Sequence, residues 1–227
     1  MIDSYITVAG SSNGEILISK SRFIGYAVPC EKEEDAVSFV QKLRDEHKCA
    51  RHHCYAYIIG ENSGIMRYSD DGEPGGTAGL PIMEVLKQRK IVNCCIVVVR
   101  YFGGVLLGTG GLVRAYTQAA QAAVDAAGVV RMELTGVDIC ELPYSSWDRF
   151  RYAAEHLPVK IDNVEYAQMI SFHIIYRVSD REFVISRLME ATDRKLSSIP
   201  KEEIYAPWKV ESKPPAKPVV CTTPSRR

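Results

Sequence analysis

Five glycines between an apolar run and an alanine-rich segment limit the folds open to this chain more than any other feature. Residues 100–116 read RYFGGVLLGTGGLVRAY, and the run IVVV at residues 96–99 precedes them. The apolar run predicts a buried strand, and the small residues spaced over 112–127 predict a helix that lies close to a sheet. Glycine is costly inside regular structure, so such a cluster marks a tight turn, close packing or backbone that faces a ligand.

The hydrophobic pattern predicts an α+β protein made of two units and a tail. The first unit is residues 1–134, and the dipeptide Asn13-Gly14 within it is typical of a hairpin turn. The elements expected there are strands at 4–8, 15–19 and 22–28, a helix at 31–48, strands at 54–59 and 65–68, a helix at 80–88, a strand at 94–101 and a helix at 112–127.

The second unit, residues 135–208, has the pattern of a ferredoxin-like split βαβ module. The elements expected there are a strand at 137–142, a helix at 145–156, strands at 159–166 and 169–178, a helix capped by Asp180 that ends near 194, and room for a last strand at 197–205. Residues 209–227 combine four prolines with lysines and no apolar period, which predicts a disordered basic tail.

Composition disfavours several classes of protein. Lysine and arginine total 28, as do aspartate and glutamate, so net charge does not indicate a nucleic-acid partner. The seven cysteines form no C-x-x-C pair, which predicts buried thiols in a reducing cytoplasm instead of a disulfide framework or zinc site. No apolar run approaches the ~18 residues that span a bilayer, and no N-terminal signal segment is recognisable. We therefore expect a cytoplasmic protein with no membrane partner.

The glycine-rich run is the first candidate site, because a helix that begins after it would point free N–H groups at an anion. It is not a Walker loop, since no lysine follows the glycines, nor a dinucleotide fingerprint, since Val113 takes the place of the third glycine. Thr109 is placed to cap the helix. The alternative is that the glycines only allow a tight crossover and close helix–sheet contact. The residues predicted to bind the ligand or its phosphate, with Tyr101 and Phe102 as stacking faces, are Arg100, Tyr101, Phe102, Gly103, Gly104, Gly108, Thr109, Gly110, Gly111 and Arg114.

An acidic loop, residues 69–77, is the second candidate. Its carboxylates suit Mg²⁺ in principle, but a solvated turn is the commoner fate of such residues, so we predict no metal and no cofactor. A Cys–His nucleophile at Cys54 would need a third orienting group that the sequence does not identify. The residues expected near the site are His52, Asp70, Asp71, Gly72, Glu73 and Thr77.

Two long runs resemble the YigZ/IMPACT family. They are SDDGEPGGTAGLP at residues 69–81 and VVVRYFGGVLLGTGGLVRAY at residues 97–116, and residues 52–57 are similar to a strand of the same family. The resemblance covers about residues 1–130 as an IMPACT N-terminal domain, and the second unit resembles the C-terminal domain of bacterial members. It implies a first domain like the second domain of a small-subunit ribosomal protein, with helices on one side of a mixed sheet. It implies a second domain like the C-terminal domains of elongation factor G.

Three hypotheses about function follow. The first is a non-enzymatic protein that binds RNA or the ribosome and acts on translation; replacing Arg100 and Arg114 by alanine would then weaken RNA binding. The second is an enzyme that acts on a phosphorylated small molecule or nucleotide, with His52 as general base. The third is a regulatory protein that binds another protein, as eukaryotic relatives suggest.

Geometry separates the first two hypotheses. A concave pocket shared by His52, the acidic loop and Gly110 favours the enzyme, whereas a flat face favours the RNA-binding protein. For Arg100, a structural ion pair with Asp70 or Asp71 is the alternative to a phosphate contact.

Overall fold

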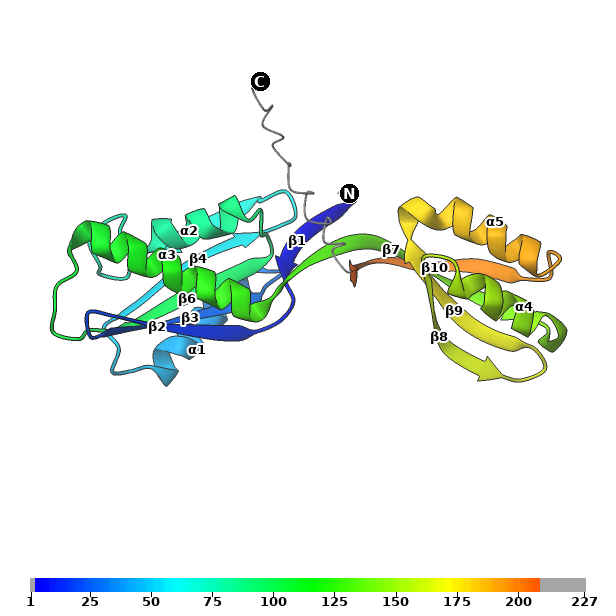
Figure 1. The fold of residues 1–227 in the computed structure, drawn as a ribbon, viewed down its shortest axis with the longest axis horizontal. Helices are drawn as coiled ribbons and strands as arrows, with labels where there is room; N and C mark the ends of the chain where they lie inside the picture. Colours follow the sequence, from blue (N-terminus) through cyan, green and yellow to red (C-terminus); the bar gives the residue numbers. More distant parts are fainter. Residues whose placement is uncertain (1–2, 209–227) are drawn as a thin grey trace, which may run out of the picture.

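The computed structural model describes residues 3–208, which form an α+β protein with two sheets. Figure 1 shows one body built on each sheet, and strand β7 (Val129–Leu142) runs from one body to the other. The predicted tail, residues 209–227, lies outside the described residues.

The first sheet is antiparallel, with the strand order β2-β3-β6-β4-β5. Seven of the eight residues of its central strand β6 are buried, as expected for a continuous apolar run. The strands are β2 (Ser12–Ile18), β3 (Ser21–Pro29), β4 (His52–Ile59), β5 (Ile65–Ser69) and β6 (Cys94–Tyr101). The helices of this body are α1 (Glu33–Glu46), α2 (Gly79–Gln88) and α3 (Gly108–Ala127).

The hairpin turn between β2 and β3 lies at Ser19 and Lys20, so the prediction from Asn13-Gly14 is wrong. Ser19 has a φ of 46° and Lys20 a φ of 66°, the left-handed backbone of a tight hairpin turn. Asn13 and Gly14 lie inside β2. A Cβ on Gly14 would stand 2.8 Å from the backbone of Ala122 in α3. Helix packing therefore requires this glycine, a reason that the dipeptide pattern does not contain.

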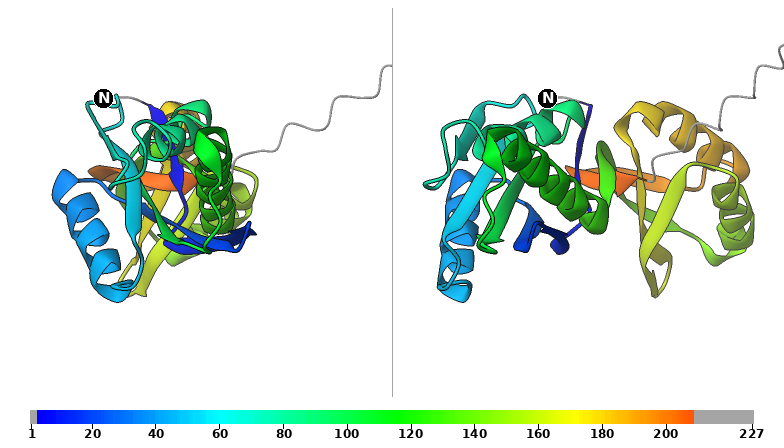
Figure 2. Two further views of the ribbon diagram at one scale, coloured as in Figure 1. Left: turned by 90° about the vertical axis from the view of Figure 1, so that its left-hand side faces the viewer. Right: turned by 60° about the vertical axis from the view of Figure 1, so that its left-hand side comes forward.

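Helices cover both faces of the first sheet, which corrects the expectation of helices on one side of a mixed sheet. Helices α2 and α3 pack on one face and α1 on the other (Figures 1 and 2). Alternation along β6 explains the arrangement. Ile96 and Val98 belong to the core beneath α2 and α3, whereas Val97 and Val99 belong to the core beneath α1. Because both sets are apolar, both faces must be covered.

Helix α3 lies close against the sheet, as its small residues predicted. A Cβ on Gly25 of β3 would overlap the carbonyl oxygen of Ala119. The helix begins at Gly108, four residues before the predicted start at Leu112. Glycines of the candidate phosphate loop therefore belong to the first turn of this helix.

The second sheet has the ferredoxin-like order β10-β7-β9-β8, with all neighbours antiparallel. Helices α4 and α5 cover one face of it (Figure 1). This confirms the predicted βαββαβ pattern, including the last strand. The elements are β7, α4 (Tyr144–Glu155), β8 (Val159–Tyr166), β9 (Ile170–Arg177), a short 3₁₀ turn η1 (Val178–Asp180), α5 (Arg181–Ala191) and β10 (Ser197–Trp208).

Strand β7 connects the two bodies. It pairs with β1 (Ser4–Val8), so the first strand of the chain joins the second sheet. The predicted boundary between residues 134 and 135 falls inside β7. The sequence gives no local sign of a domain boundary inside such a strand, because its residues continue one regular pleat from one body to the other. The division into domains at 1–134 and 135–208 stays a prediction.

No described helix is long and apolar enough to cross a membrane. The six cysteines among the described residues are free thiols, and five of them are buried.

Candidate functional site

Strand register places three side chains in a row across the first sheet. Arg100 in β6 pairs with Phe23 in β3 on one side and with His52 in β4 on the other. Directly opposed residues project to the same face of a sheet, here the face covered by α2 and α3. The Arg100 guanidinium lies 5.3 Å from the centre of the Phe23 ring and 5.5 Å from that of Phe102. Two aromatic rings therefore hold this cation.

Glu73 reaches this row from the acidic loop. Arg100 Nη1 donates a hydrogen bond to Glu73 Oε1 over 2.5 Å, and the Tyr116 hydroxyl donates to the same oxygen over 2.8 Å. Burial raises the pKa of Tyr116 far above its usual value, so the phenol remains a donor. The ion pair expected as the structural role of Arg100 exists, but its partner is Glu73 and not Asp70 or Asp71.

One ring nitrogen of His52 faces the Glu73 carboxylate. Its Nδ1 lies 2.8 Å from the carbonyl oxygen of Asp71. A carbonyl only accepts, so Nδ1 carries a proton and donates it, and in the neutral ring Nε2 is the acceptor. Nε2 lies 3.9 Å from Glu73 Oε1. The imidazole is thus oriented with its basic nitrogen toward Glu73.

Asp70 stabilises the loop and the start of α2. Its carboxylate accepts hydrogen bonds from the backbone N–H groups of Gly76, Ala78 and Gly79 over 2.8, 3.0 and 2.8 Å. Ala78 and Gly79 lie at the helix N-terminus, where a negative charge is favourable. The side chain predicted to lie near the ligand is therefore used to shape the loop.

Asp71 is also occupied by protein partners. Its carboxylate accepts from Arg44 over 2.8 Å and from the backbone N–H of His53 over 2.7 Å. Among residues 3–208, no group of three or more histidine, cysteine, aspartate or glutamate side chains is placed to hold a metal ion.

A pocket of about 450 Å³ opens between the Arg100–Glu73 pair and the start of α3. This volume lies within the range of small-molecule sites. We call it the Arg100 pocket. Its lining residues are Arg51, His52, Glu73, Pro74, Arg100, Phe102, Leu106, Leu107, Gly108, Thr109 and Leu112.

The N-terminus of α3 forms one wall of the Arg100 pocket. Leu107 is the N-cap residue, and no side chain of residues 3–208 caps the helix, which corrects the prediction that Thr109 does so. Gly108 and Thr109 are the first two helical residues and line the pocket. The first N–H groups of a helix have no partner within it, and they carry the positive end of its dipole.

Six of the predicted site residues line the pocket, and the other ten do not. The six are His52, Glu73, Arg100, Phe102, Gly108 and Thr109. Tyr101 follows Arg100 in β6 and so points to the opposite face, where its hydroxyl lies 2.7 Å from His47 Nδ1 beside the end of α1. Arg114 is exposed and donates from Nε to the Gly110 carbonyl over 3.2 Å. Outside the lining are Tyr101, Gly103, Gly104, Gly110, Gly111, Arg114, Asp70, Asp71, Gly72 and Thr77.

Gly103 has a structural role. A Cβ at this position would overlap the backbone of Lys20 in the β2–β3 turn. Close packing, the alternative to a ligand contact for the glycine cluster, therefore accounts for Gly103.

Sequence reasoning missed several lining residues. Arg51 directly precedes His52, and this position is the only feature of the sequence that could have placed it at the site. Leu106, Leu107 and Leu112 look like packing residues in the sequence, although Leu106 is 88% exposed. Tyr116 lies outside the lining but donates a hydrogen bond to Glu73, and in the sequence it looks like one more residue of the apolar stripe of α3.

Cys54 is not suited to nucleophilic catalysis. Burial raises the pKa of its thiol far above the usual value, and its Sγ donates to the carbonyl oxygen of Asp70 over 3.0 Å. This agrees with a packing role.

Comparison with known proteins places these residues in a family. The Impact N-terminal domain model matches residues 19–124, which include the whole Arg100 pocket. IMPACT family member YvyE of Bacillus subtilis (strain 168) is 36% identical over 195 residues, covering 86% of this chain and 90% of that protein. IMPACT family member YigZ of Escherichia coli (strain K12) is 50% identical over 101 residues, covering 44% of this chain and 50% of that protein.

A solved structure supports the fold. It is titled "Crystal structure of an hypothetical protein" and is similar with a TM-score of 0.58 and 30% identity, covering 89% of this chain and 99% of that one. The long match to YvyE spans both bodies, and the domain match includes both sides of the Arg100 pocket. The chain therefore belongs to the IMPACT family.

Proposed function

We propose that this protein binds a phosphate-bearing small molecule of nucleotide size in the Arg100 pocket. One observation carries the proposal: His52, Glu73 and the first turn of α3 converge on one concave pocket. A shared concave pocket is the geometry expected of the second hypothesis, although Gly110 lies outside its lining and Gly108 and Thr109 of the same helical turn line it instead.

The positive groups of the pocket support an anionic ligand. Arg51 is exposed at the pocket, and the N-terminus of α3 adds the positive end of a helix dipole. Arg100 is 5% exposed, and its Nε has no hydrogen-bond partner among the described residues. Its guanidinium charge is paired with one oxygen of Glu73, which accepts from Nη1. A buried polar atom without a partner carries a cost that a ligand oxygen would remove.

The remaining lining supports a ligand with an organic part. Phe102, Leu106 and Leu107 provide apolar surface, and Phe102 offers a ring for stacking. Glu73 and His52 Nε2 supply acceptors for hydroxyl groups. A nucleoside phosphate combines an anionic group, hydroxyl donors and a planar ring. In an enzyme of this kind, His52 Nε2 would be the proton acceptor.

Isothermal titration calorimetry with the four ribonucleoside monophosphates tests the proposal, with inorganic phosphate and the parent nucleosides as partial ligands. We expect the monophosphates to bind more tightly than either part. Arg51→Gln should weaken binding by about tenfold, the effect of one lost charge-assisted contact.

Arg114→Gln is the matched control, because it removes an exposed arginine that does not line the pocket. The proposal would be contradicted if Arg51→Gln bound the monophosphates as tightly as the unchanged protein. It would also be contradicted if Arg51→Gln and Arg114→Gln lost the same affinity. Arg100 is a poor test residue, since its removal leaves Glu73 buried without a counter-charge.

A contact with RNA or the ribosome, acting on translation, is the second candidate. Its support is the exposed surface near the pocket, where Arg51 and Arg114 are accessible and Phe102 is 40% exposed for stacking on a base. Co-sedimentation with ribosomes and with bulk RNA at low and physiological salt tests it. The double variant Arg51→Gln/Arg114→Gln should flatten the salt dependence by about two units. Salt-independent or absent co-sedimentation would remove this candidate.

We propose the cytoplasm as the site of action. Free thiols among the described cysteines fit a reducing compartment. A protein partner in translational control is a further hypothesis, which rests on the family resemblance.

A further inference from the structure

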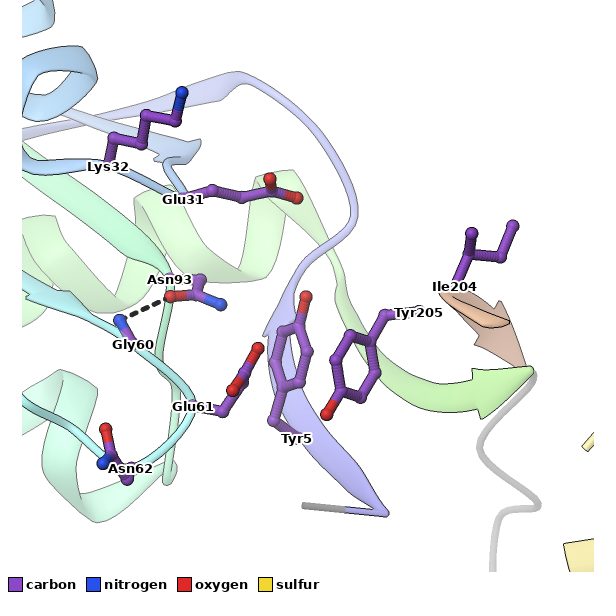
Figure 3. Close-up of a pocket in the computed structure, with 9 residues that line it drawn as sticks. All are labelled: Tyr5, Glu31, Lys32, Gly60, Glu61, Asn62, Asn93, Ile204 and Tyr205. Carbon is purple, nitrogen blue, oxygen red and sulfur yellow. Dashed lines mark hydrogen bonds between the residues drawn. The ribbon is translucent and has the colours of Figure 1, made fainter. Parts of the chain in front are cut away.

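A second pocket lies where the two bodies meet. It has a volume of about 800 Å³, and its lining shares no residue with the Arg100 pocket. Figure 3 shows its side chains, and we call it the junction pocket. Its lining residues are Tyr5, Glu31, Lys32, Gly60, Glu61, Asn62, Asn93, Ile204 and Tyr205.

Strand pairing brings these distant segments together. Tyr5 lies in β1 and Tyr205 in β10, and both strands pair with β7. The two rings are 5.1 Å apart at an interplanar angle of 67°, so they form an edge-to-face aromatic wall. Glu31 follows β3 and Glu61 follows β4, so the first body supplies the polar side of the junction pocket.

Two carboxylates, those of Glu31 and Glu61, line the junction pocket together with its aromatic wall. Burial raises the pKa of Tyr5, and the nearby carboxylates of Glu31 and Glu61 raise it further. In Figure 3 the Glu61 carboxylate lies beside the Tyr5 ring, whereas the Lys32 side chain points away from it. Lys32 also lines the junction pocket, and in Figure 3 its ammonium lies away from the Glu61 carboxylate.

Buried polar groups are directed into this space. Asn93 is 6% exposed, and its Oδ1 accepts from the backbone N–H of Gly60 over 2.7 Å, which fixes the amide. A hydrogen bond with the Asn93 side chain opposes the rise in the Tyr5 pKa, as a donor to the phenol oxygen does. Tyr5 is 8% exposed, and its oxygen has two lone pairs. The phenol can therefore accept a second hydrogen bond from a ligand donor.

We propose that the junction pocket binds a linear aliphatic diamine or polyamine, with its ammonium groups at Glu31 and Glu61 and its methylene chain against Tyr5 and Tyr205. Carboxylates accept the hydrogen bonds of an ammonium group, and aromatic rings provide apolar surface for a methylene chain. Two carboxylates on separate loops suit a ligand with two charges. Because β10 and the first body both line the junction pocket, the ligand bridges the two bodies.

Isothermal titration calorimetry of the full chain with spermidine and with putrescine tests this site. The neutral analogue 1,4-butanediol has the carbon chain of putrescine without its charges. The test variant is Glu31→Gln/Glu61→Gln, which keeps side-chain size. The matched control is Glu34→Gln/Glu155→Gln, which removes two exposed carboxylates outside the junction pocket.

The unchanged protein and the control should bind spermidine with the same Kd, and the test variant should bind at least about tenfold more weakly. Butanediol should give no binding. Absence of amine binding, equal binding by the test variant, or equal binding of butanediol would each overturn the proposal. Binding of N-acetyl-lysine methylamide without binding of either free amine would also overturn it, because the site would then take a protein side chain.

Discussion

Arg100 and Glu73 form an ion pair of 2.5 Å between Nη1 and Oε1, with side chains that are 6% and 4% exposed. The two residues are 27 positions apart, and their pairing fixes the acidic loop against the central strand of the first sheet. Both residues line the Arg100 pocket.

Loss of either partner should destabilise the protein strongly. Glu73→Gln leaves the Arg100 guanidinium buried without a counter-charge, and we expect a loss of about 3–5 kcal/mol in the free energy of unfolding. Urea denaturation measures it. The double variant Arg100→Met/Glu73→Gln should lose less than the sum of the single variants, because it removes both charges. Additive losses would show that the pair is not coupled.

Gly25→Ala should destabilise through its backbone neighbours. The added Cβ would overlap the Ala119 carbonyl of α3, which has no flexible end to move away. We expect about 3 kcal/mol or more from the forced shift of helix against sheet. Gly10→Ala is the control, because a Cβ at this position would have no neighbour within 4 Å in the part of the chain that the structure describes. Similar thermal unfolding of the two variants would refute the close packing.

His53 should make stability fall at acidic pH. Burial lowers the pKa of its imidazole, so the unfolded chain takes up a proton at a higher pH than the folded protein. Stability from this residue is therefore present above its unfolded pKa of about 6.5 and is lost as the pH falls below it.

Urea titrations at about pH 7.5 and about pH 5.5 measure this loss on either side of the unfolded pKa. His53→Gln should lose less stability over that interval than the unchanged protein. His156→Gln, at an exposed histidine, should behave like the unchanged protein. A steeper loss in His53→Gln would mean that the sign is wrong.

Cysteine reactivity should separate Cys49 from the buried thiols. Cys49 is exposed, whereas burial raises the pKa of Cys30 and of Cys140 to about 11. Because the thiolate is the reactive form, iodoacetamide near neutral pH should modify Cys49 in the native protein and leave Cys30 and Cys140 unmodified until it is denatured. Peptide mass spectrometry assigns each site. Rapid native modification of Cys30 would contradict the packing of α1.

Much of the secondary structure could be predicted because its signals are local. The apolar run of β6 and the small residues of α3 indicate a buried strand and a close helix, and both are found. The ferredoxin-like order of the second sheet is likewise predictable from element order and spacing. The start of α3 is not, because glycine in a first turn looks the same in sequence as glycine in a loop.

The candidate site was only partly predictable. The glycine run and the acidic loop are recognisable from their chemistry, and His52, Glu73 and Arg100 do meet. Alternation along a strand sends Arg100 and Tyr101 to opposite faces, so the prediction that both belong to one ligand site conflicts with the strand predicted at 94–101. No local pattern selects Glu73 over Asp70 as the partner of Arg100.

The elements and the family can be inferred from the order of residues alone, because hydrophobic period and long motifs are properties of neighbouring residues. The folded chain alone shows which carboxylate neutralises Arg100, where β1 pairs, and where the two pockets lie. Those outcomes depend on strand register and on contacts between segments far apart in the chain, such as the 27 positions that separate Arg100 and Glu73. Such contacts form only when the whole sheet is assembled.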